Sequence, residues 1–220
     1  MMTQTKETQL NMTAEKALQL LKEGNLRFVN NQRLERDLTQ QVATTGNEGQ
    51  FPHSVVLNCI DSRVTAEYLF DQGVGDVFSA RVAGNFANTD IIGSMEFAVL
   101  NAGVKLIVVL GHTQCGAVKG TCDFLYKPEG EKPNLAQNLI TMASENLAAT
   151  AQAVANNYPG DHTSSNGEFI QHVADENVHV TIAKILDESP AIKKAVEESN
   201  GTIKIVGAMY DVKNGIVTWM

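Results

Sequence analysis

The segment from Lys105 to Gly111 (KLIVVLG) places the strongest constraint on the fold. It is almost wholly apolar and shows no alternation with polar side chains, so it predicts a central strand buried on both faces of a sheet. Two more short apolar segments, Ser54 to Cys59 and Val77 to Ala83, also predict strands. Helical segments near Thr65 to Phe70 and from Thr89 to Asn101 lie between them. This alternation predicts a largely parallel sheet with helices covering it.

Helices are also expected on either side of this region. Ala17, Leu18, Leu21 and Phe28 recur at helical spacing, so the segment from Thr13 to about Asn31 predicts an amphipathic helix. Such a helix packs either on a partner subunit or on its own domain. Residues 33–49 are polar and lack apolar periodicity, which indicates a connecting arm. Further helices are expected within Asn134 to Asn157 and from about Glu168 to Asp187, and Ser189-Pro190 opens another.

The C-terminal residues predict two strands, Thr202 to Tyr210 and Ile216 to Trp219. Asn214-Gly215 lies between them and is a favoured hairpin turn, so the last strand should run antiparallel at an edge of the sheet. The whole chain of 220 residues fits a single α/β domain. We expect residues 1–49 to form an N-terminal helical arm and residues 50–220 to form the core.

Charge and composition exclude several classes of protein. The formal net charge is −8, with no basic run that could neutralise nucleic-acid phosphates. No segment approaches the length of a membrane span, and the first eleven residues lack the apolar core of a signal peptide. We therefore expect a cytoplasmic protein without nucleic-acid or membrane partners, or a periplasmic one if a leader peptide has been removed. Three cysteines cannot all pair within one chain, so metal ligation or catalysis is the better use for some of them.

Three potential metal ligands fall at the ends of predicted strands. Cys59 closes the first strand, His112 follows the third, and Cys115 comes three residues later. Because ligands bind beyond the carboxyl ends of parallel strands, these side chains should converge at one rim. Two thiolates and one imidazole suit Zn²⁺, and three protein ligands leave a fourth position open, as in catalytic zinc sites. The sequence therefore predicts one catalytic zinc ion per subunit.

A carboxylate and a guanidinium follow the first of these ligands. Asp61 lies two residues beyond Cys59, and Arg63 lies two residues beyond Asp61. A carboxylate beside a metal-bound hydroxide can accept its hydrogen bond, and a bidentate arginine can hold that carboxylate in place. We expect Asp61 and Arg63 to be the catalytic pair. Arg81 either supports this site or pairs elsewhere in the fold.

The motifs Cys59-x-Asp61-x-Arg63 and His112-x-x-Cys115 together resemble the signature of the β-class carbonic anhydrases. The resemblance extends through Arg81-Val-Ala-Gly-Asn85 and the segment 111–120, and covers the chain from about Thr13 onward. It implies zinc on the two cysteines and the histidine, and reversible hydration of carbon dioxide to bicarbonate and a proton by a zinc-bound hydroxide.

The resemblance also implies a substrate pocket. Gln50 matches a glutamine that hydrogen-bonds substrate, Phe78 an apolar pocket residue, and Gly116 the glycine beside the second cysteine. Phe97 stands where plant-like members carry tyrosine. In the family this pocket lies at a dimer interface, so a homodimer or a dimer of dimers is expected, with CO₂ and bicarbonate as the small-molecule partners.

One position bears on regulation. Members inhibited by bicarbonate at a separate site carry tryptophan three residues before the first cysteine, and Val56 occupies that position here. The chain therefore resembles the unregulated, plant-like branch with an open site.

Two alternative functions remain open from the sequence. A hydrolase of carbonyl sulfide or carbon disulfide on the same scaffold would keep all five central residues. A non-catalytic zinc or thiol module would instead require a closed four-ligand site or a disulfide between Cys59 and Cys115.

The ligand charges predict how activity depends on pH. Zinc with two thiolates and one neutral imidazole is formally neutral, whereas zinc with three imidazoles keeps its double positive charge, so the neutral site should acidify bound water less. We expect CO₂ hydration to increase toward mildly alkaline pH, which stopped-flow assays across the pH range would measure. Activity that is flat from acid to alkaline pH would contradict this charge argument.

Overall fold

A five-stranded sheet forms the centre of the molecule, seen in the computed structural model, which describes residues 3–220. The strand order is β2-β1-β3-β4-β5. The first four strands pair in parallel, and β5 pairs antiparallel to β4 at one edge, as the sequence predicts. The strands are β1 (Ser54–Asn58), β2 (Val77–Arg81), β3 (Leu106–His112), β4 (Lys204–Tyr210) and β5 (Val217–Trp219).

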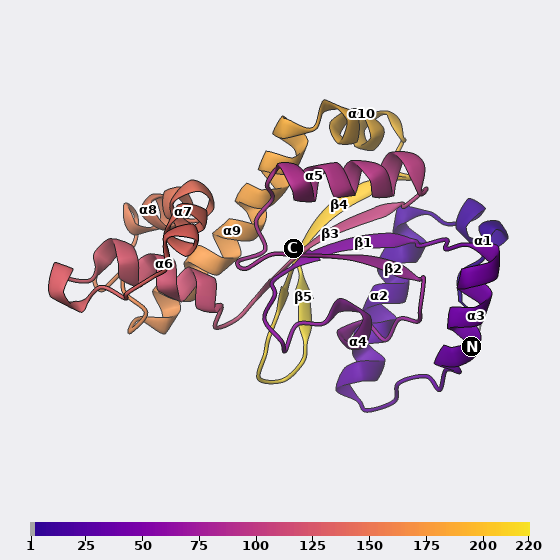
Figure 1. Cartoon of the computed structure of the whole chain (residues 1–220), viewed down its shortest axis with the longest axis horizontal. Coiled ribbons are helices and arrows are strands. Elements are labelled where there is room, and N and C mark those ends of the chain that lie inside the picture. Colours follow the sequence, from indigo (N-terminus) through magenta and orange to yellow (C-terminus); the bar gives the residue numbers. More distant parts are fainter. Residues whose placement is uncertain (1–2) are drawn as a thin grey trace.

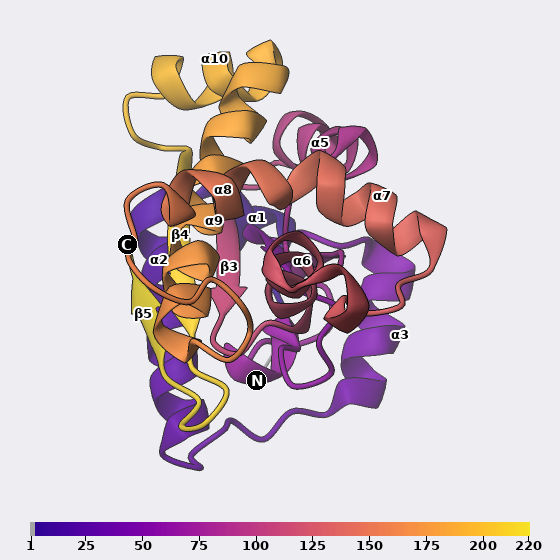
Figure 2. The ribbon, with the colours of Figure 1, turned by 90° about the vertical axis from the view of Figure 1, so that its left-hand side faces the viewer.

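Helices cover both faces of this sheet (Figure 1). In the figure, α5 and α10 lie above the sheet and α2 and α4 below it, while α6, α7 and α8 gather at the end toward which the parallel strands run. Figure 2 looks at that end of the molecule. The helical segments are α1 (Lys6–Leu10), α2 (Ala14–Val29), α3 (Leu38–Glu48), α4 (Ala66–Leu69), α5 (Thr89–Glu96), η1 (Phe97–Asn101), α6 (Gly116–Tyr126), η2 (Glu129–Glu131), α7 (Gln137–Asn146), α8 (Ala148–Ala155), α9 (Gly167–Glu188) and α10 (Pro190–Glu198).

Strand β3 separates two hydrophobic cores. Ile107 and Val109 belong to the core formed with α5 and α9, whereas Leu106, Val108 and Leu110 belong to the core formed with α2 and α4. All seven residues of the strand are buried. This arrangement confirms the prediction that the apolar run is a central strand with both faces covered.

The N-terminal helix α2 packs on its own sheet. Its Ala17 and Leu21 are fully buried in the core with β3. Asn25 fixes the helix further, because its amide donates to Leu69 O and Gly215 O and accepts from Val217 N. Of the two packing arrangements considered from sequence, α2 therefore uses its own domain.

The segment after α2 contains a helix although its sequence lacks apolar periodicity. Residues 33–49 predict a connecting arm within an N-terminal helical arm of residues 1–49, and α3 occupies Leu38–Glu48 of that arm. Asp37 caps it by accepting from Gln40 N, and Gln41, on the face toward β2, accepts from Val74 N. A polar helix of this kind is stabilised by its cap and by side-chain hydrogen bonds, so it leaves no apolar periodicity in the sequence.

Asp71 holds the connection between α2 and α3. Its carboxylate contacts Arg27 Nε at 2.6 Å and Arg36 Nη1 at 2.5 Å, and it accepts from Leu34 N at 3.2 Å. The Asp71 side chain is only 3% exposed, so this paired charge is shielded from water. The N-terminal segment is thus tied to the turn that follows α4.

Among residues 3–220, no helix is both long enough and apolar enough to cross a membrane.

A buried histidine lies directly before the first strand of the sheet. His53 is fully buried, and its Nε2 lies 2.9 Å from Gln72 Oε1. Because Gln72 Nε2 donates to Phe70 O, its Oε1 must accept from His53 Nε2–H, which leaves His53 Nδ1 to accept from Ser54 Oγ at 2.7 Å. Burial lowers the pKa of His53, so the neutral ring is the folded form.

We expect the free energy of unfolding of the metal-free protein to decrease as the pH falls below about 6.5. In that range His53 binds a proton in the unfolded chain, whereas buried His53 in the folded protein stays neutral. His53→Gln should reduce this pH dependence, although it lowers stability at pH 8. Urea unfolding of both proteins between pH 5.5 and 8 would measure it. His179→Gln, at an exposed histidine, is the matched control and should leave the slope unchanged. Equal slopes for wild type and His53→Gln would contradict the assignment.

Candidate metal centre

Two neighbouring strands bring three ligating side chains together. Strands β1 and β3 pair in parallel with Asn58 opposite Leu110, so Cys59, directly after β1, lies beside the end of β3. His112 is the last residue of β3, and Cys115 is the N-cap of α6. The two sulfur atoms and the ligating nitrogen all lie within 4.8 Å of one another, and all three residues are buried. The structure thus brings the three predicted ligands to one point.

The ring of His112 is held in the tautomer that leaves Nε2 available to bind a cation. His112 Nδ1 lies 3.0 Å from Thr113 O, and since a carbonyl can only accept, Nδ1 carries the proton. The other nitrogen, Nε2, is buried and has no hydrogen-bond partner. A buried nitrogen with a free lone pair is costly unless something fills that position. A metal ion beside the two thiols would do so, and the Nδ1 hydrogen bond would orient the ring.

The two thiols are electrostatically coupled. The pKa of Cys59 is well below its usual value, chiefly because the Cys115 thiol hydrogen-bonds to the Cys59 thiolate. The pKa of Cys115 is raised, because Cys59 takes its hydrogen bond and burial disfavours a second negative charge. A bound cation would compensate both charges and allow both thiols to ionise. The donor set of two sulfurs and one nitrogen therefore fits zinc.

Asp61 and Arg63 form a bidentate ion pair beside the ligands. Arg63 Nε donates to Asp61 Oδ1 at 2.9 Å, Arg63 Nη2 donates to Asp61 Oδ2 at 2.7 Å, and the Arg63 backbone N–H adds a third bond. These hydrogen bonds lower the pKa of Asp61 to about 2. The Asp61 carboxylate is therefore ionised at neutral pH and is held by Arg63.

Arg81 supports the loop that carries these residues. Its Nε donates to Cys59 O at 3.1 Å and its Nη2 donates to Asp61 O at 2.8 Å. The guanidinium thus spans two carbonyl groups of the Cys59–Asp61 segment, a geometry that the single ammonium of lysine cannot reproduce. Of the two roles considered for Arg81, the structure shows support of the site.

A glycine turn supplies a hydrogen bond to the Cys59 sulfur. Gly84 N–H donates to Cys59 Sγ at 3.3 Å. Gly84 has φ +86°, and a Cβ there would lie 2.9 Å from Leu147 Cδ1, so the position suits only glycine. Gly84 belongs to the motif Arg81-Val-Ala-Gly-Asn85, but its contact with Cys59 depends on a turn between distant residues and leaves no local signal in the sequence.

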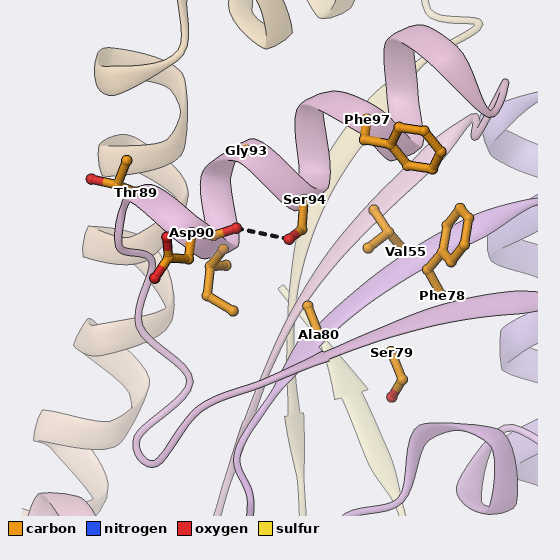
Figure 3. Close-up of a pocket in the computed structure, with 10 residues that line it drawn as sticks. Val55, Phe78, Ser79, Ala80, Thr89, Asp90, Gly93, Ser94 and Phe97 are labelled. Atoms are coloured by element: carbon orange, nitrogen blue, oxygen red, sulfur yellow. Dashed lines mark hydrogen bonds between the residues drawn. The ribbon is translucent and has the colours of Figure 1, made fainter.

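The expected pocket residues are not all brought to the ligands within one chain. Phe78 and Phe97 face one another with ring centroids 6.3 Å apart, and they line an open groove of about 690 Å³ beside β2 (Figure 3). None of the three ligands lines this groove. Gly116 adjoins Cys115 as the first residue of α6. Gln50 is exposed and lies before β1, at the opposite end from Cys59.

The chain matches the model of one protein family, described as carbonic anhydrase, over residues 54–217. It is 37% identical over 203 residues to a carbonic anhydrase of Mycolicibacterium smegmatis, an alignment that covers 91% of this chain and 90% of that protein. It is 34% identical over 200 residues to carbonic anhydrase 2 of Mycobacterium tuberculosis, with 90% and 89% covered.

Solved structures agree with these relatives. The β-carbonic anhydrase CcaA superposes with a TM-score of 0.64 at 26% identity, covering 92% of this chain and 94% of that one. One of two tetrameric β-carbonic anhydrases of Sordaria macrospora gives a TM-score of 0.67 at 26% identity, with 83% and 88% covered. The chain therefore belongs to the carbonic anhydrase family, in its β class, and is an enzyme of that family.

The Gly84 turn gives a test of the metal centre. Gly84→Ala places a side chain on a left-handed backbone, which costs about 1–2 kcal/mol, and pushes it against Leu147. We expect this variant to retain less zinc per chain after dialysis against a chelator, because the N–H is turned away from Cys59. Gly120→Ala, at a helical glycine of α6 with open space around it, is the matched control and should retain metal as the wild type does. Equal retention by both variants would contradict the assigned contact.

Proposed function

We propose that this chain catalyses the reversible hydration of carbon dioxide to bicarbonate with one zinc ion held by Cys59, His112 and Cys115. The observation that carries the proposal is the convergence of the three ligand atoms within 4.8 Å, with His112 Nε2 buried and unpaired. Membership of the carbonic anhydrase family supports the same conclusion. When bound, zinc supplies a Lewis acid that makes water a nucleophile near neutral pH.

In the proposed mechanism Asp61 orients the attacking water. Its carboxylate, kept ionised by Arg63, accepts a hydrogen bond from that water and so directs a lone pair toward the carbon of CO₂. Arg63 acts through Asp61, because both carboxylate oxygens are engaged by its guanidinium. Arg81 keeps the backbone of Cys59 and Asp61 in register with one another.

The substrate residues support a site shared between two copies of the chain. Residues 51–58 separate Gln50 from Cys59, and the five of them that form β1 alone span roughly 17 Å. Gln50 therefore does not reach the metal ligands of its own chain. We propose that a second copy brings its Gln50 to the site, with Phe78 and Phe97 forming the apolar wall for CO₂ and Gly116 lying beside the second cysteine.

The sheet offers a surface for such pairing. β2 is an edge strand with no neighbour on its outer side among the described residues, and the groove containing Phe78 lies beside it. Phe97 is 56% exposed and Leu100 is 52% exposed, so the adjoining helix presents apolar surface to water. These features support a homodimer or a dimer of dimers. One solved relative is described as tetrameric.

The two alternative functions differ from the proposed one in their ligand set or in their substrate. A non-catalytic zinc module needs a fourth protein ligand, whereas the cluster found within residues 3–220 contains three ligating residues. A hydrolase of carbonyl sulfide or carbon disulfide would use the same cluster, so it is separated by parallel assays of these substrates and CO₂.

We expect Asp61→Asn to lower kcat/KM for CO₂ hydration about 10- to 100-fold while the zinc content stays near one per chain, because an amide oxygen is a weaker, uncharged acceptor and the amide NH₂ cannot accept from Arg63. Stopped-flow hydration and metal analysis measure the two quantities. Asp187→Asn, at an exposed aspartate of α9, is the matched control and should keep wild-type activity. An inactive, metal-free wild type would overturn the proposed function.

A further inference from the structure

We propose that Asn177 of α9 is a positioning residue for the metal centre, acting through Gly84 to set the hydrogen bond that the Cys59 sulfur receives. The inference rests on the metal role proposed for Cys59. Two buried hydrogen bonds carry it: Asn177 Nδ2 donates to Gly84 O at 2.9 Å, and Gly84 N–H donates to Cys59 Sγ at 3.3 Å.

Asn177 stands on a helix face that is otherwise built for packing. Its neighbours Val173, Ala174, Val178 and Thr181 are all buried against the sheet or the surrounding helices. Asn177 itself is 1% exposed, and its Oδ1 has no hydrogen-bond partner. A half-satisfied amide in this position costs free energy that an apolar residue of the same size would avoid. Stability alone therefore does not account for an asparagine here.

The hydrogen bond from Asn177 restrains the backbone of Gly84. Glycine has the greatest backbone freedom of any residue, so its N–H points at a fixed target only when the flanking peptides are restrained. The peptide group that follows the Gly84 Cα is held at both of its polar atoms: Asn85 N donates to Val82 O at 3.0 Å, and Gly84 O accepts from Asn177. Losing the Asn177 bond loosens this peptide, and rotation about the Gly84 backbone bonds then turns the Gly84 N–H away from the Cys59 sulfur.

A backbone hydrogen bond to a metal-bound thiolate withdraws electron density from sulfur and orients its lone pairs. Losing it makes the sulfur a stronger electron donor. It also leaves the sulfur less well oriented and the repulsion between the two neighbouring thiolates less well offset, and this loss of preorganisation weakens metal binding. The polar groups that orient metal ligands in this way typically contribute about 10- to 100-fold in metal affinity. Asn177 does not contact the Cys59 sulfur itself but acts through Gly84. We therefore expect its loss to lower the metal affinity by about 10-fold, near the lower end of this range.

The experiment compares the wild-type chain with Asn177→Leu, which removes the donor and keeps the branched shape of the side chain, and with Asn177→Thr. Threonine cannot span the same distance, and its hydroxyl can bond to a carbonyl of its own helix, so it provides a second variant if leucine impairs folding. Asn25→Leu is the matched control, because Asn25 is also a buried asparagine that binds backbone groups, between α2, α4 and β5.

Three quantities are measured for each protein: zinc affinity by chelator competition, the sulfur-to-metal charge-transfer band after Co²⁺ substitution, and urea unfolding of the metal-free chain. Both Asn177 variants should bind zinc about 10-fold more weakly and shift the band to longer wavelength. Asn25→Leu should lower the free energy of unfolding and leave the affinity and the band unchanged.

Wild-type affinity and band position in both Asn177 variants would overturn the inference. So would an equal loss of affinity in Asn25→Leu, since the effect would then follow from general destabilisation. A wild type without any charge-transfer band would overturn the proposed metal centre itself, which distinguishes failure of the proposed function from failure of the role given to Asn177.

Discussion

The parallel pairing of β1 with β3 is the interaction on which the rest of the structure depends. It is stabilised from both sides, because alternate residues of β3 enter the core with α9 and the core with α2. It also fixes where the two strands end, so Cys59 and His112 emerge side by side. A shift of the register by one residue would exchange the β3 side chains between the two cores and separate these two ligands. The strand pairing that joins the two cores therefore also brings two of the three ligands together.

Much of this arrangement could be predicted from the sequence, because the signals involved are local. An apolar run such as Lys105–Gly111 has few alternatives to a central strand, and reactive residues directly after such runs must lie at one rim. The antiparallel edge strand followed from a turn signal at Asn214-Gly215 in the same way. In each case a few neighbouring residues are enough to predict the element.

The features that were not predicted depend on contacts between distant parts of the chain. Helix α3 is polar, and its stability comes from the Asp37 cap and from docking against the residues before β2, which leave no periodic pattern. The role of Gly84 requires a turn whose glycine reaches back to Cys59, and Asn177 is 93 residues away from Gly84. A polar residue on an apolar helix face was the only local signal of Asn177, and such a residue is recognised only once that face is known to be buried.

The position of Gln50 at the far end of β1 has a consequence for how the enzyme is built. In the proposed dimer, one strand belongs to two centres: its last residue leads into the metal ligands of its own chain, and the segment before its first residue serves the other chain. Each active site is then built from residues of two polypeptides. A lesion near Gln50 would be silent in the chain that carries it and would appear in its neighbour, so two differently damaged copies could together restore one working site.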